Sequence, residues 1–297
     1  MQREEENPKA IYLLKRALEI SPNYVDALFL LTAFAEGPER DELAERLLTL
    51  DPDNPEMKSF VALERAYEGD LAGAARLMEE AAETNPYSSL VLFNSARLAE
   101  FCGKTDLAVR LGEYIAVRDP LFFWSQLNLA QYYLKAGRTE DALRQFEVAV
   151  SINENAGDVR WKFGLALLTA SNPVAALAEF EREEARVYRL HGLVMAYHDL
   201  GREEESAAAL RELTKTEEEI WPFGMARAHA WIGNADETFR YLEATFELGR
   251  LGRFGGLATH PLFQRLYSDP RWPAFLSSVG QSPEQVAAFK FAVEPPE

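Results

Sequence analysis

The hydrophobic positions between residues 121 and 154 predict two short amphipathic helices. Apolar side chains recur there at spacings of three and four residues: Leu127, Ala130, Tyr133 and Leu134 in the first half, and Ala142, Leu143, Phe146, Ala149 and Val150 in the second. This spacing places each set on one face of a helix. Gly137 ends the first helix, and residues 138–141 open the second. The two helices form a hairpin whose apolar face needs cover from further hairpins.

The hairpin recurs along the chain with a period of 34 residues. Three kinds of residue mark this period: Gly69, Gly103 and Gly137 at the turn, Ala74, Ala108, Ala142 and Ala176 in the second helix, and Pro52, Pro86 and Pro120 after it. Three independent kinds of marker residue share the same spacing of 34 residues, so chance does not explain the pattern. The pattern therefore predicts a solenoid of stacked helical hairpins.

The repeated pattern resembles that of the tetratricopeptide repeat (TPR) family. That family has a small residue in helix A, an aromatic residue three positions on, Gly at the turn, and then Ala, an aromatic residue, Ala and a closing Pro. In the unit 121–154 these residues are Ala130, Tyr133, Gly137, Ala142, Phe146 and Ala149, with Glu154 in place of Pro. The resemblance implies an all-α fold, a right-handed superhelical solenoid of antiparallel helix pairs.

We expect this TPR array to occupy residues 1–248, with about seven repeats. The successive units cover residues 23–52, 55–86, 87–120, 121–154, 156–184, 185–217 and 219–248. Residues 10–22 match a helix B without a helix A, because residues 1–9 are too few and too polar to form one. Either the chain is a fragment of a longer protein, or its first half-repeat acts as a cap. The apolar edge at residues 10–20 also fits a homodimer through an open solenoid end.

Residues 249–297 break the period and predict a hinge followed by capping helices. The Gly-rich stretch after Gly249 predicts a loop. Short helices are expected from His260 to Tyr267 and from Asp269 to Leu276, and a last one starts at Ser282. Four aromatic residues of this tail are expected to cover the open end of the solenoid: Trp272, Phe275, Phe289 and Phe291.

The tail also resembles the C-terminal end of bacterial multidomain signalling proteins. The matching pieces are His260-Pro261, the segment 266–272 and Gly280. In those proteins a TPR array follows an effector, such as a winged-helix DNA-binding domain, a nucleotide cyclase or a kinase. The resemblance implies that the chain is the TPR region of a signalling or transcription-regulating protein.

The chain is strongly acidic, with 31 Lys and Arg against 48 Asp and Glu and a formal net charge of -17. Such a surface repels phosphate backbones and anionic membranes, so we expect no nucleic-acid binding by this region and no membrane insertion. The first ten residues lack the apolar stretch of a secretory signal. The single cysteine, Cys102, fits a reducing compartment. We expect a cytoplasmic protein, and a periplasmic location is the alternative if a membrane span precedes this region in a longer protein.

The sequence contains no pattern that predicts catalysis. His191 and His198 lie seven residues apart on one predicted helix, whereas a zinc site needs closer ligands together with a carboxylate or a cysteine. No nucleophile-elbow, P-loop or dinucleotide-binding pattern occurs. We therefore predict no enzyme activity, no catalytic residue, no metal site and no cofactor. A hydrolase or metalloenzyme is the least favoured alternative.

The remaining candidate site is a groove, because helix A of each repeat lines the concave face of such a solenoid. In the TPR family, the second, fifth, sixth, ninth and thirteenth positions of a repeat point inward, counted with the turn glycine at position fifteen. The resulting candidates are Phe93, Asn94, Arg97, Trp124, Asn128, Gln131, Lys135, Trp161, Lys162, His191 and His198. The alternative is structural, with Asn94 and Asn128 as contacts between helices, and Trp124 and Trp161 as packing between repeats.

These observations predict an interaction or regulatory scaffold that binds a protein or peptide in its groove. Aromatic side chains supply contact area, and amide side chains pair with peptide bonds. A small-molecule sensor is the alternative, with a ligand enclosed by the aromatic residues and histidines near residues 188–198.

Overall fold

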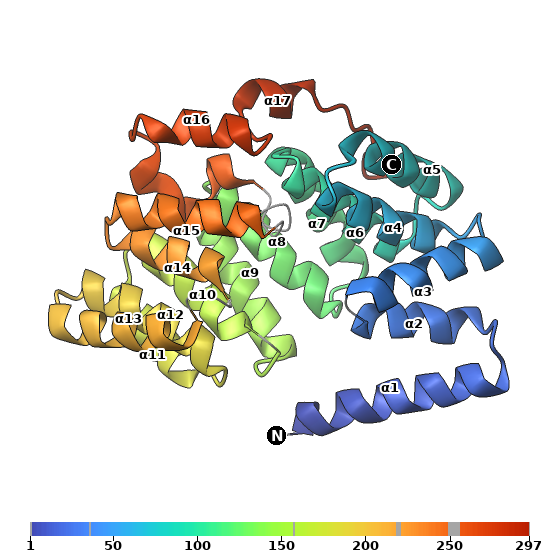
Figure 1. Cartoon of the computed structure of the whole chain (residues 1–297), viewed down its shortest axis with the longest axis horizontal. Helices are drawn as coiled ribbons and strands as arrows, with labels where there is room; N and C mark the ends of the chain where they lie inside the picture. The colour runs from blue at the N-terminus through green and yellow to red at the C-terminus, as the bar shows by residue number, and fades with distance from the viewer. Residues whose placement is uncertain (1, 36, 157, 218–220, 249–255, 297) are drawn as a thin grey trace.

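The computed structural model describes residues 2–35, 37–156, 158–217, 221–248 and 256–296. These residues form helices, turns and loops without a strand, and the helices stack into a curved array (Figure 1). The helices of the array are α1 Gln2–Ile20, α2 Val25–Phe34, α3 Gly37–Leu50, α4 Pro55–Tyr67, α5 Leu71–Thr84, α6 Ser89–Phe101, α7 Thr105–Arg118, α8 Phe123–Lys135, α9 Thr139–Ile152, α10 Val159–Thr169, α11 Pro173–Arg182, α12 Arg186–Asp199, α13 Glu203–Glu217, α14 Pro222–Trp231 and α15 Ala235–Glu247. The tail adds the 3-10 helices η2 Leu257–Thr259 and η3 Pro261–Leu266, and the α-helices α16 Arg271–Ser278 and α17 Pro283–Ala288. The predicted all-α class is confirmed.

Consecutive helices pair into hairpins, from α2 with α3 to α14 with α15. A residue with a positive φ lies at the turn of most pairs, at Gly69, Gly103, Gly137, Gly201 and Gly233. Glycine has no Cβ and adopts this left-handed backbone without strain. Ser171 takes the same place between α10 and α11, at φ 58°, and is the one non-glycine residue with a positive φ in the described ranges. The hairpin geometry is thus kept where the marker glycine is missing.

Helix α1 is longer than the sequence pattern predicts. Residues 2–9 lack an apolar face, yet they extend the helix predicted at residues 10–20. Gln, Glu, Arg and Lys are good helix formers even without such a face. Tyr12, Leu13 and Ile20 are exposed on α1. A homodimer through this surface stays a prediction.

Small residues allow the helices to approach each other closely. Ala130 and Ala142 are fully buried between α8 and α9, as their spacing predicts. The buried ring of Phe180 lies against Gly164 and Gly192, and a Cβ added to either glycine would come within 2.4 or 2.1 Å of the ring. The packing of α10, α11 and α12 therefore depends on the absence of side chains at these two positions.

The tail has two parts that pack on different regions of the array. Trp272 and Phe275 of α16 are buried against the last repeat, where the Phe275 and Phe239 ring centroids lie 6.0 Å apart. Phe289 and Phe291 follow α17 and pack instead on the core of the repeats α4 to α9. Figure 1 shows the tail passing from α15 across to α5. The tail therefore reaches further than the end cap that the sequence predicts.

Two polar contacts hold the far end of the tail on the early repeats. Arg110 Nη2 lies 2.8 Å from a carboxylate oxygen of Glu294. The backbone N–H of Ala292 donates to Glu79 Oε1 at 2.9 Å. The tail thus links the last repeat to the repeats of α5 and α7. The predicted hinge falls on residues 249–255, which lie outside the described residues.

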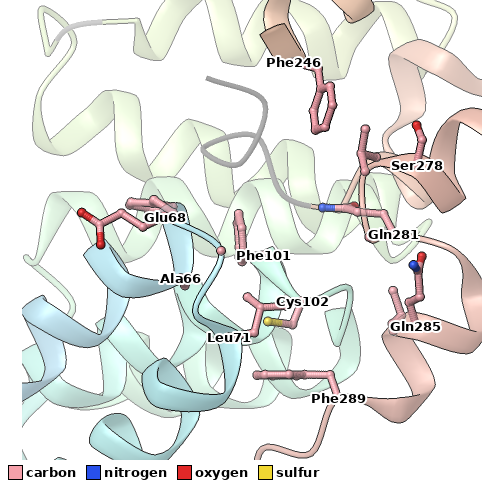
Figure 2. A pocket seen from close by; sticks show the side chains of 15 residues that line it. Ala66, Glu68, Leu71, Phe101, Cys102, Phe246, Ser278, Gln281, Gln285 and Phe289 are labelled. Atoms are coloured by element: carbon pink, nitrogen blue, oxygen red, sulfur yellow. The ribbon is translucent and has the colours of Figure 1, made fainter. Parts of the chain in front are cut away.

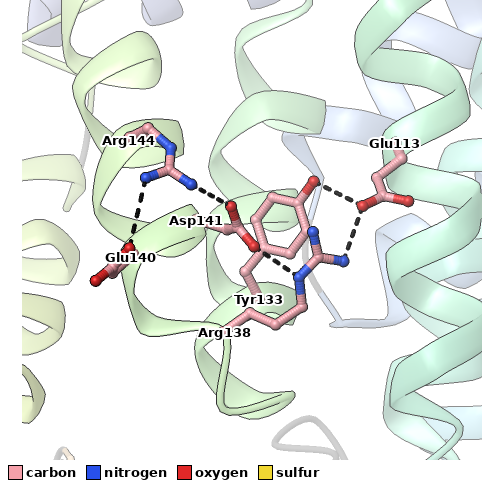
Figure 3. A network of polar contacts seen from close by, with 6 residues as sticks. All are labelled: Glu113, Tyr133, Arg138, Glu140, Asp141 and Arg144. Atoms are coloured by element: carbon pink, nitrogen blue, oxygen red, sulfur yellow. Dashed lines mark hydrogen bonds and ion pairs between the residues drawn. The ribbon is translucent and has the colours of Figure 1, made fainter.

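A polar network joins the turn between α8 and α9 to α7 (Figure 3). The Tyr133 hydroxyl and Arg138 Nη1 both donate to Glu113 Oε1 at 2.9 Å. Arg138 Nε also donates to Asp141 at 2.7 Å. Burial and the bond to Glu113 raise the pKa of Tyr133 to about 12. Because these charged groups are partly exposed, their ion pairs add little stability.

Candidate binding site on the inner face of the array

Six successive first helices line one cavity on the inner face of the array. It has a volume of about 340 Å³, and we call it the central cavity. Its lining comes from α4, α6, α8, α10, α12, α14 and the start of η3, through Tyr67, Arg97, Glu100, Phe101, Asn128, Gln131, Tyr132, Lys135, Asp158, Trp161, Lys162, Tyr188, Trp221, Phe223, Arg227 and His260. This follows from the repeat, because stacked hairpins place their first helices side by side.

Six of the eleven residues predicted for the groove line the central cavity. They are Arg97, Asn128, Gln131, Lys135, Trp161 and Lys162. They occupy the fifth, sixth, ninth and thirteenth positions of their repeats, where the family pattern expects inward side chains. Their role in binding stays a prediction.

Three other predicted groove residues lie away from the central cavity. Asn94 is buried, and its Nδ2 donates to Ser59 Oγ at 2.9 Å, which makes it a contact between α6 and α4. Phe93 packs on Phe122, with ring centroids 5.1 Å apart. Trp124 is 50% exposed, since it lies in the first turn of α8 beyond the cavity. The position of Asn94 therefore agrees better with a contact between helices, the structural alternative, than with a groove residue.

His191 is buried behind the cavity wall and fixes the position of Trp161. Trp161 Nε1 donates to His191 Nδ1 at 2.9 Å, and His191 Nε2 lies 3.0 Å from the Gly224 carbonyl oxygen. The neutral tautomer with its proton on Nε2 satisfies both contacts. Burial and the nearby Arg227 charge hold the pKa of His191 well below its usual range. His198 is partly buried near the end of α12 and does not line the cavity.

The described wall of the central cavity carries more positive than negative side chains. Its cations are Arg97, Lys135, Lys162 and Arg227, and its anions are Glu100 and Asp158. Lys135 forms an ion pair with Glu100, and Lys162 Nζ lies 3.0 Å from Asp158 Oδ1. Four cations against two anions leave an excess of two positive charges, in a chain whose net charge is -17. Such a local excess favours an anionic ligand.

Arg227 is the most deeply buried cation of this wall, with an exposed fraction of 8%. Its guanidinium carbon lies 4.7, 5.1 and 4.9 Å from the ring centroids of Trp161, Trp221 and Phe223. Its Nε is buried without a hydrogen-bond partner. Burial lowers the pKa of Arg227 to about 10, so the side chain stays charged at neutral pH.

A small apolar pocket opens beside Arg227, with a volume of about 70 Å³. We call it the side pocket. It shares six residues with the central cavity and adds apolar ones, namely Leu134, Phe146, Leu165, Pro261 and Leu262. His260 lines both spaces, and burial together with the charges of Lys135 and Arg227 holds the pKa of His260 well below its usual range. Polar and apolar surfaces therefore meet next to Arg227.

Arg227 and Phe223 are absent from the groove residues predicted from the sequence. The unit 219–248 matches the TPR pattern weakly, because Thr238 replaces the helix-B alanine. With Gly233 at position fifteen, Phe223 takes position five and Arg227 takes position nine. The same count extended to this last unit would therefore have found both residues.

A second cavity of about 340 Å³ lies where the tail crosses the early repeats. Figure 2 shows Leu71, Phe101 and Cys102 on one side of it, with Gln285 and Phe289 of the tail on the other. Burial raises the pKa of the Cys102 thiol to about 12. The thiol is therefore protonated and unreactive at neutral pH.

The described residues also bear on metal binding and on membrane insertion. In those ranges, no group of three or more His, Cys, Asp or Glu side chains is placed to hold a metal ion. None of the helices described combines the length and the apolar character that crossing a membrane requires.

Comparison with solved structures identifies the fold. Human IFIT1, in a dimer with m7Gppp-AAAA, is a TPR protein that matches with a TM-score of 0.63 and 16% identity, over 82% of this chain and 68% of that one. The chain has the TPR fold. PilF of Pseudomonas aeruginosa, another TPR protein, matches with a TM-score of 0.50 and 15% identity, over 73% of this chain and 95% of that one.

Comparison of sequences adds one relative. No model of a known protein family matches this chain. An uncharacterized protein of Haemophilus influenzae is 40% identical over 63 residues, which cover 21% of this chain and 35% of that protein. The chain thus spans about a third of the length of this curated relative.

Proposed function

We propose that the chain is an interaction scaffold whose central cavity recognises an acidic segment of a partner protein. The observation that carries the proposal is the cluster of cations around this cavity in an otherwise acidic chain. Opposite charges accelerate the encounter with the right partner, and the acidic outer surface disfavours other modes of contact.

Amide side chains beside the cations suit the main chain of a peptide. Asn128 and Gln131 both line the central cavity, and Gln131 Nε2 donates to Asn128 Oδ1 at 3.2 Å. A carboxamide both donates and accepts, so it can pair with the N–H and the C=O of a peptide bond. The cavity therefore offers groups for the backbone of a bound segment as well as for its charges.

The charge distribution favours a protein segment over a nucleic acid. The described cavity wall has an excess of only two positive charges, whereas a nucleic acid carries a phosphate at every nucleotide. The acidic remainder of the chain repels that backbone. Because the human IFIT1 structure contains m7Gppp-AAAA, an oligonucleotide belongs among the ligands to be tested.

The resemblance of the tail sequence suggests the biological setting of this scaffold: we propose that it is the TPR region of a bacterial signalling or transcription-regulating protein. His260 begins the stretch that carries this resemblance, and its side chain lines the central cavity. Photo-cross-linking in the source cells from a reactive residue placed at Asn128 tests this setting. An effector or transcription regulator as the main product agrees with it, and a metabolic enzyme as the main product contradicts it.

Selection of displayed random peptides on the full chain tests the proposed function. We expect enrichment of Asp and Glu on the wild type and its loss on the Arg97→Ala/Lys162→Ala variant. Arg211→Ala, at an exposed position of α13, is the matched control and should select the same peptides as the wild type. Selection without acidic enrichment contradicts the proposal, as does an oligonucleotide that binds more tightly than the selected peptides.

A small-molecule sensor is the second candidate, and the size of the central cavity favours it. The cavity volume of about 340 Å³ lies in the range of small-molecule sites, and its wall combines aromatic rings with a few charged groups. A thermal-shift screen of metabolites distinguishes the two. A shift with a metabolite, without any binding of acidic peptides, would favour the sensor.

A further inference from the structure

We infer that Arg227 is the anchor of the central cavity and that it binds a carboxylate attached to an apolar group. This inference rests on the proposed function, because the carboxylate would belong to the acidic segment that the cavity recognises. It assigns a ligand chemistry to one point, where the central cavity meets the side pocket.

Arg227 has N–H groups without an acceptor. A guanidinium carries five N–H donors. None of them takes part in a hydrogen bond or ion pair within the described part of the chain, and Nε is shielded from solvent as well. A buried charge without a partner is costly, because the protein does not replace the water that the charge has lost. Nη1 and Nη2 are not fully buried, so a ligand oxygen can supply the acceptor that these groups lack.

Three aromatic rings surround the guanidinium of Arg227. The Trp161, Trp221 and Phe223 rings lie within cation–π distance of the guanidinium and stabilise its charge. They also crowd it, so the N–H edge of the guanidinium is the approach that suits a ligand. A carboxylate is planar and pairs with that edge through two parallel hydrogen bonds. A phosphate can pair with that edge as well, so the charge of the ligand has to decide between the two.

Where the central cavity meets the side pocket, the other charges favour a ligand with one negative charge. Arg97 is the other cation of the described wall without a carboxylate partner, and it lines the central cavity but not the side pocket. Lys135 and Lys162 already have carboxylate partners, Glu100 and Asp158. Those two carboxylates line the same cavity and repel additional negative charge. A phosphate monoester carries a charge of about -1.5 to -2 at neutral pH. A carboxylate therefore fits the field around Arg227 better than a phosphate does.

The side pocket accounts for the apolar group. Leu134, Phe146 and Leu165 line it together with Arg227. A carboxylate bound at Arg227 thus has an apolar recess directly beside it. Burying an apolar substituent there adds hydrophobic free energy to the charge pairing. A chain end with an aliphatic side chain, or an acidic side chain beside an apolar neighbour, offers both groups.

Isothermal titration calorimetry of the full chain with N-acetyl-leucine tests the anchor. This compound has a free carboxylate next to an aliphatic side chain. We expect it to bind, and we expect its amide and inorganic phosphate to bind at least tenfold more weakly. N-acetyl-glutamic acid α-amide carries its carboxylate on the side chain, so the tighter binder of the two acids tells whether a chain end or an acidic side chain is the source.

Substitutions of Arg227 connect the binding to this residue. Arg227→Met removes the charge and keeps an apolar stem, and we expect it to weaken N-acetyl-leucine binding at least tenfold without lowering the melting temperature. Arg227→Lys keeps the charge but not the planar fork, and we expect weaker binding here too, which preserves the test if the Met variant does not fold. The matched control Arg211→Met lies at an exposed site and should bind like the wild type.

Three results would overturn the inference: equal binding of N-acetyl-leucine by wild type and Arg227→Met, no binding by the wild type, or tighter binding of phosphate. The same variants distinguish failure of the Arg227 anchor from failure of the proposed function. In one outcome, acidic peptides bind Arg227→Met as tightly as the wild type and fail to bind Arg97→Ala/Lys162→Ala. This result would contradict the role of Arg227 as the anchor and would agree with the proposed function. Binding of N-acetyl-leucine without binding of any acidic peptide would keep the anchor and remove the proposed function.

Discussion

The indole N–H of Trp161 donates a hydrogen bond to His191 Nδ1 at 2.9 Å, and both side chains are buried. His191 in turn contacts the carbonyl of Gly224, so one imidazole joins α10, α12 and α14. The Trp221 ring lies against the same glycine, where a Cβ would come within 2.1 Å of it. The aromatic wall of the central cavity is therefore positioned by buried contacts behind it.

Replacement of His191 by Leu is expected to lower the free energy of unfolding by about 2–6 kcal/mol. It leaves the Trp161 N–H and the Gly224 carbonyl without this partner, and each buried unsatisfied group costs about 1–3 kcal/mol. Urea unfolding measures the loss. His198→Leu is the control, because the His198 side chain makes no hydrogen bond or ion pair in the part of the chain that the structure describes, and it should cost less than about 1 kcal/mol. Equal losses would contradict the role given to the two hydrogen bonds.

The free energy of unfolding is expected to fall as the pH drops from 7 to 5. Burial holds the pKa of His191 and of His260 below the ordinary value of about 6.5. Both histidines thus stay neutral in the folded chain and gain protons in the unfolded chain. Below pH 6.5 the unfolded state therefore binds more protons, and each histidine lowers the free energy of unfolding by about 1.4 kcal/mol per pH unit until its folded pKa is reached.

Urea unfolding at pH 7, 6 and 5 measures this dependence. The His191→Leu variant should show a shallower dependence than the wild type, because one of the two histidines is gone. A wild-type protein that is equally stable at pH 7 and pH 5 would show that neither imidazole is held neutral.

Ser171→Gly is expected to raise the free energy of unfolding by about 0.5–1 kcal/mol. Ser171 has a φ of 58° at a turn where five other repeats have glycine, and a left-handed backbone strains residues that carry a Cβ. Thermal unfolding measures the gain. The reverse change, Gly137→Ser at φ 74°, should lower the melting temperature. A loss of stability in Ser171→Gly together with a gain in Gly137→Ser would show that the backbone angle φ does not decide stability at the turns.

Phe291→Ala is expected to lower the free energy of unfolding by about 2–4 kcal/mol. Phe291 is buried on the core of the early repeats, and its truncation removes apolar contact and leaves a cavity. Glu294→Gln should change the stability by less than about 0.5 kcal/mol, since Glu294 and Arg110 form an exposed ion pair. Urea unfolding of both variants compares them. A larger effect at Glu294 would mean that charge rather than apolar burial holds the tail.

The period of the sequence was enough to predict the helix pairs and part of the central cavity. Each hairpin packs on its neighbour, so local spacing alone decides which side of a first helix faces inward. For this reason Asn128, Gln131 and Lys135 lie where the pattern places them. Asn94 holds the same repeat position as Asn128, yet its amide bonds to Ser59 on the neighbouring helix. The repeat period does not predict which side chain of the neighbouring helix lies next to such an amide.

The course of the tail and the place of Arg227 were not predicted, for different reasons. Phe291 packs on repeats more than a hundred residues earlier in the chain, and such a contact leaves no periodic signal. Arg227 lies at a regular position of a unit whose other markers are weak. The position of Phe291 depends on tertiary packing, whereas Arg227 follows the repeat pattern within a unit that has weak markers.

Fluorescence anisotropy at low salt, with a selected acidic peptide and the Lys162→Glu variant, tests whether the central cavity is the binding site. This change reverses one charge on the cavity wall. We expect at least tenfold weaker binding by Lys162→Glu, and a change of less than about twofold for Arg211→Glu on the exposed face of α13. Unchanged affinity in Lys162→Glu, with an unchanged melting temperature, would contradict the assignment of the central cavity as the binding site.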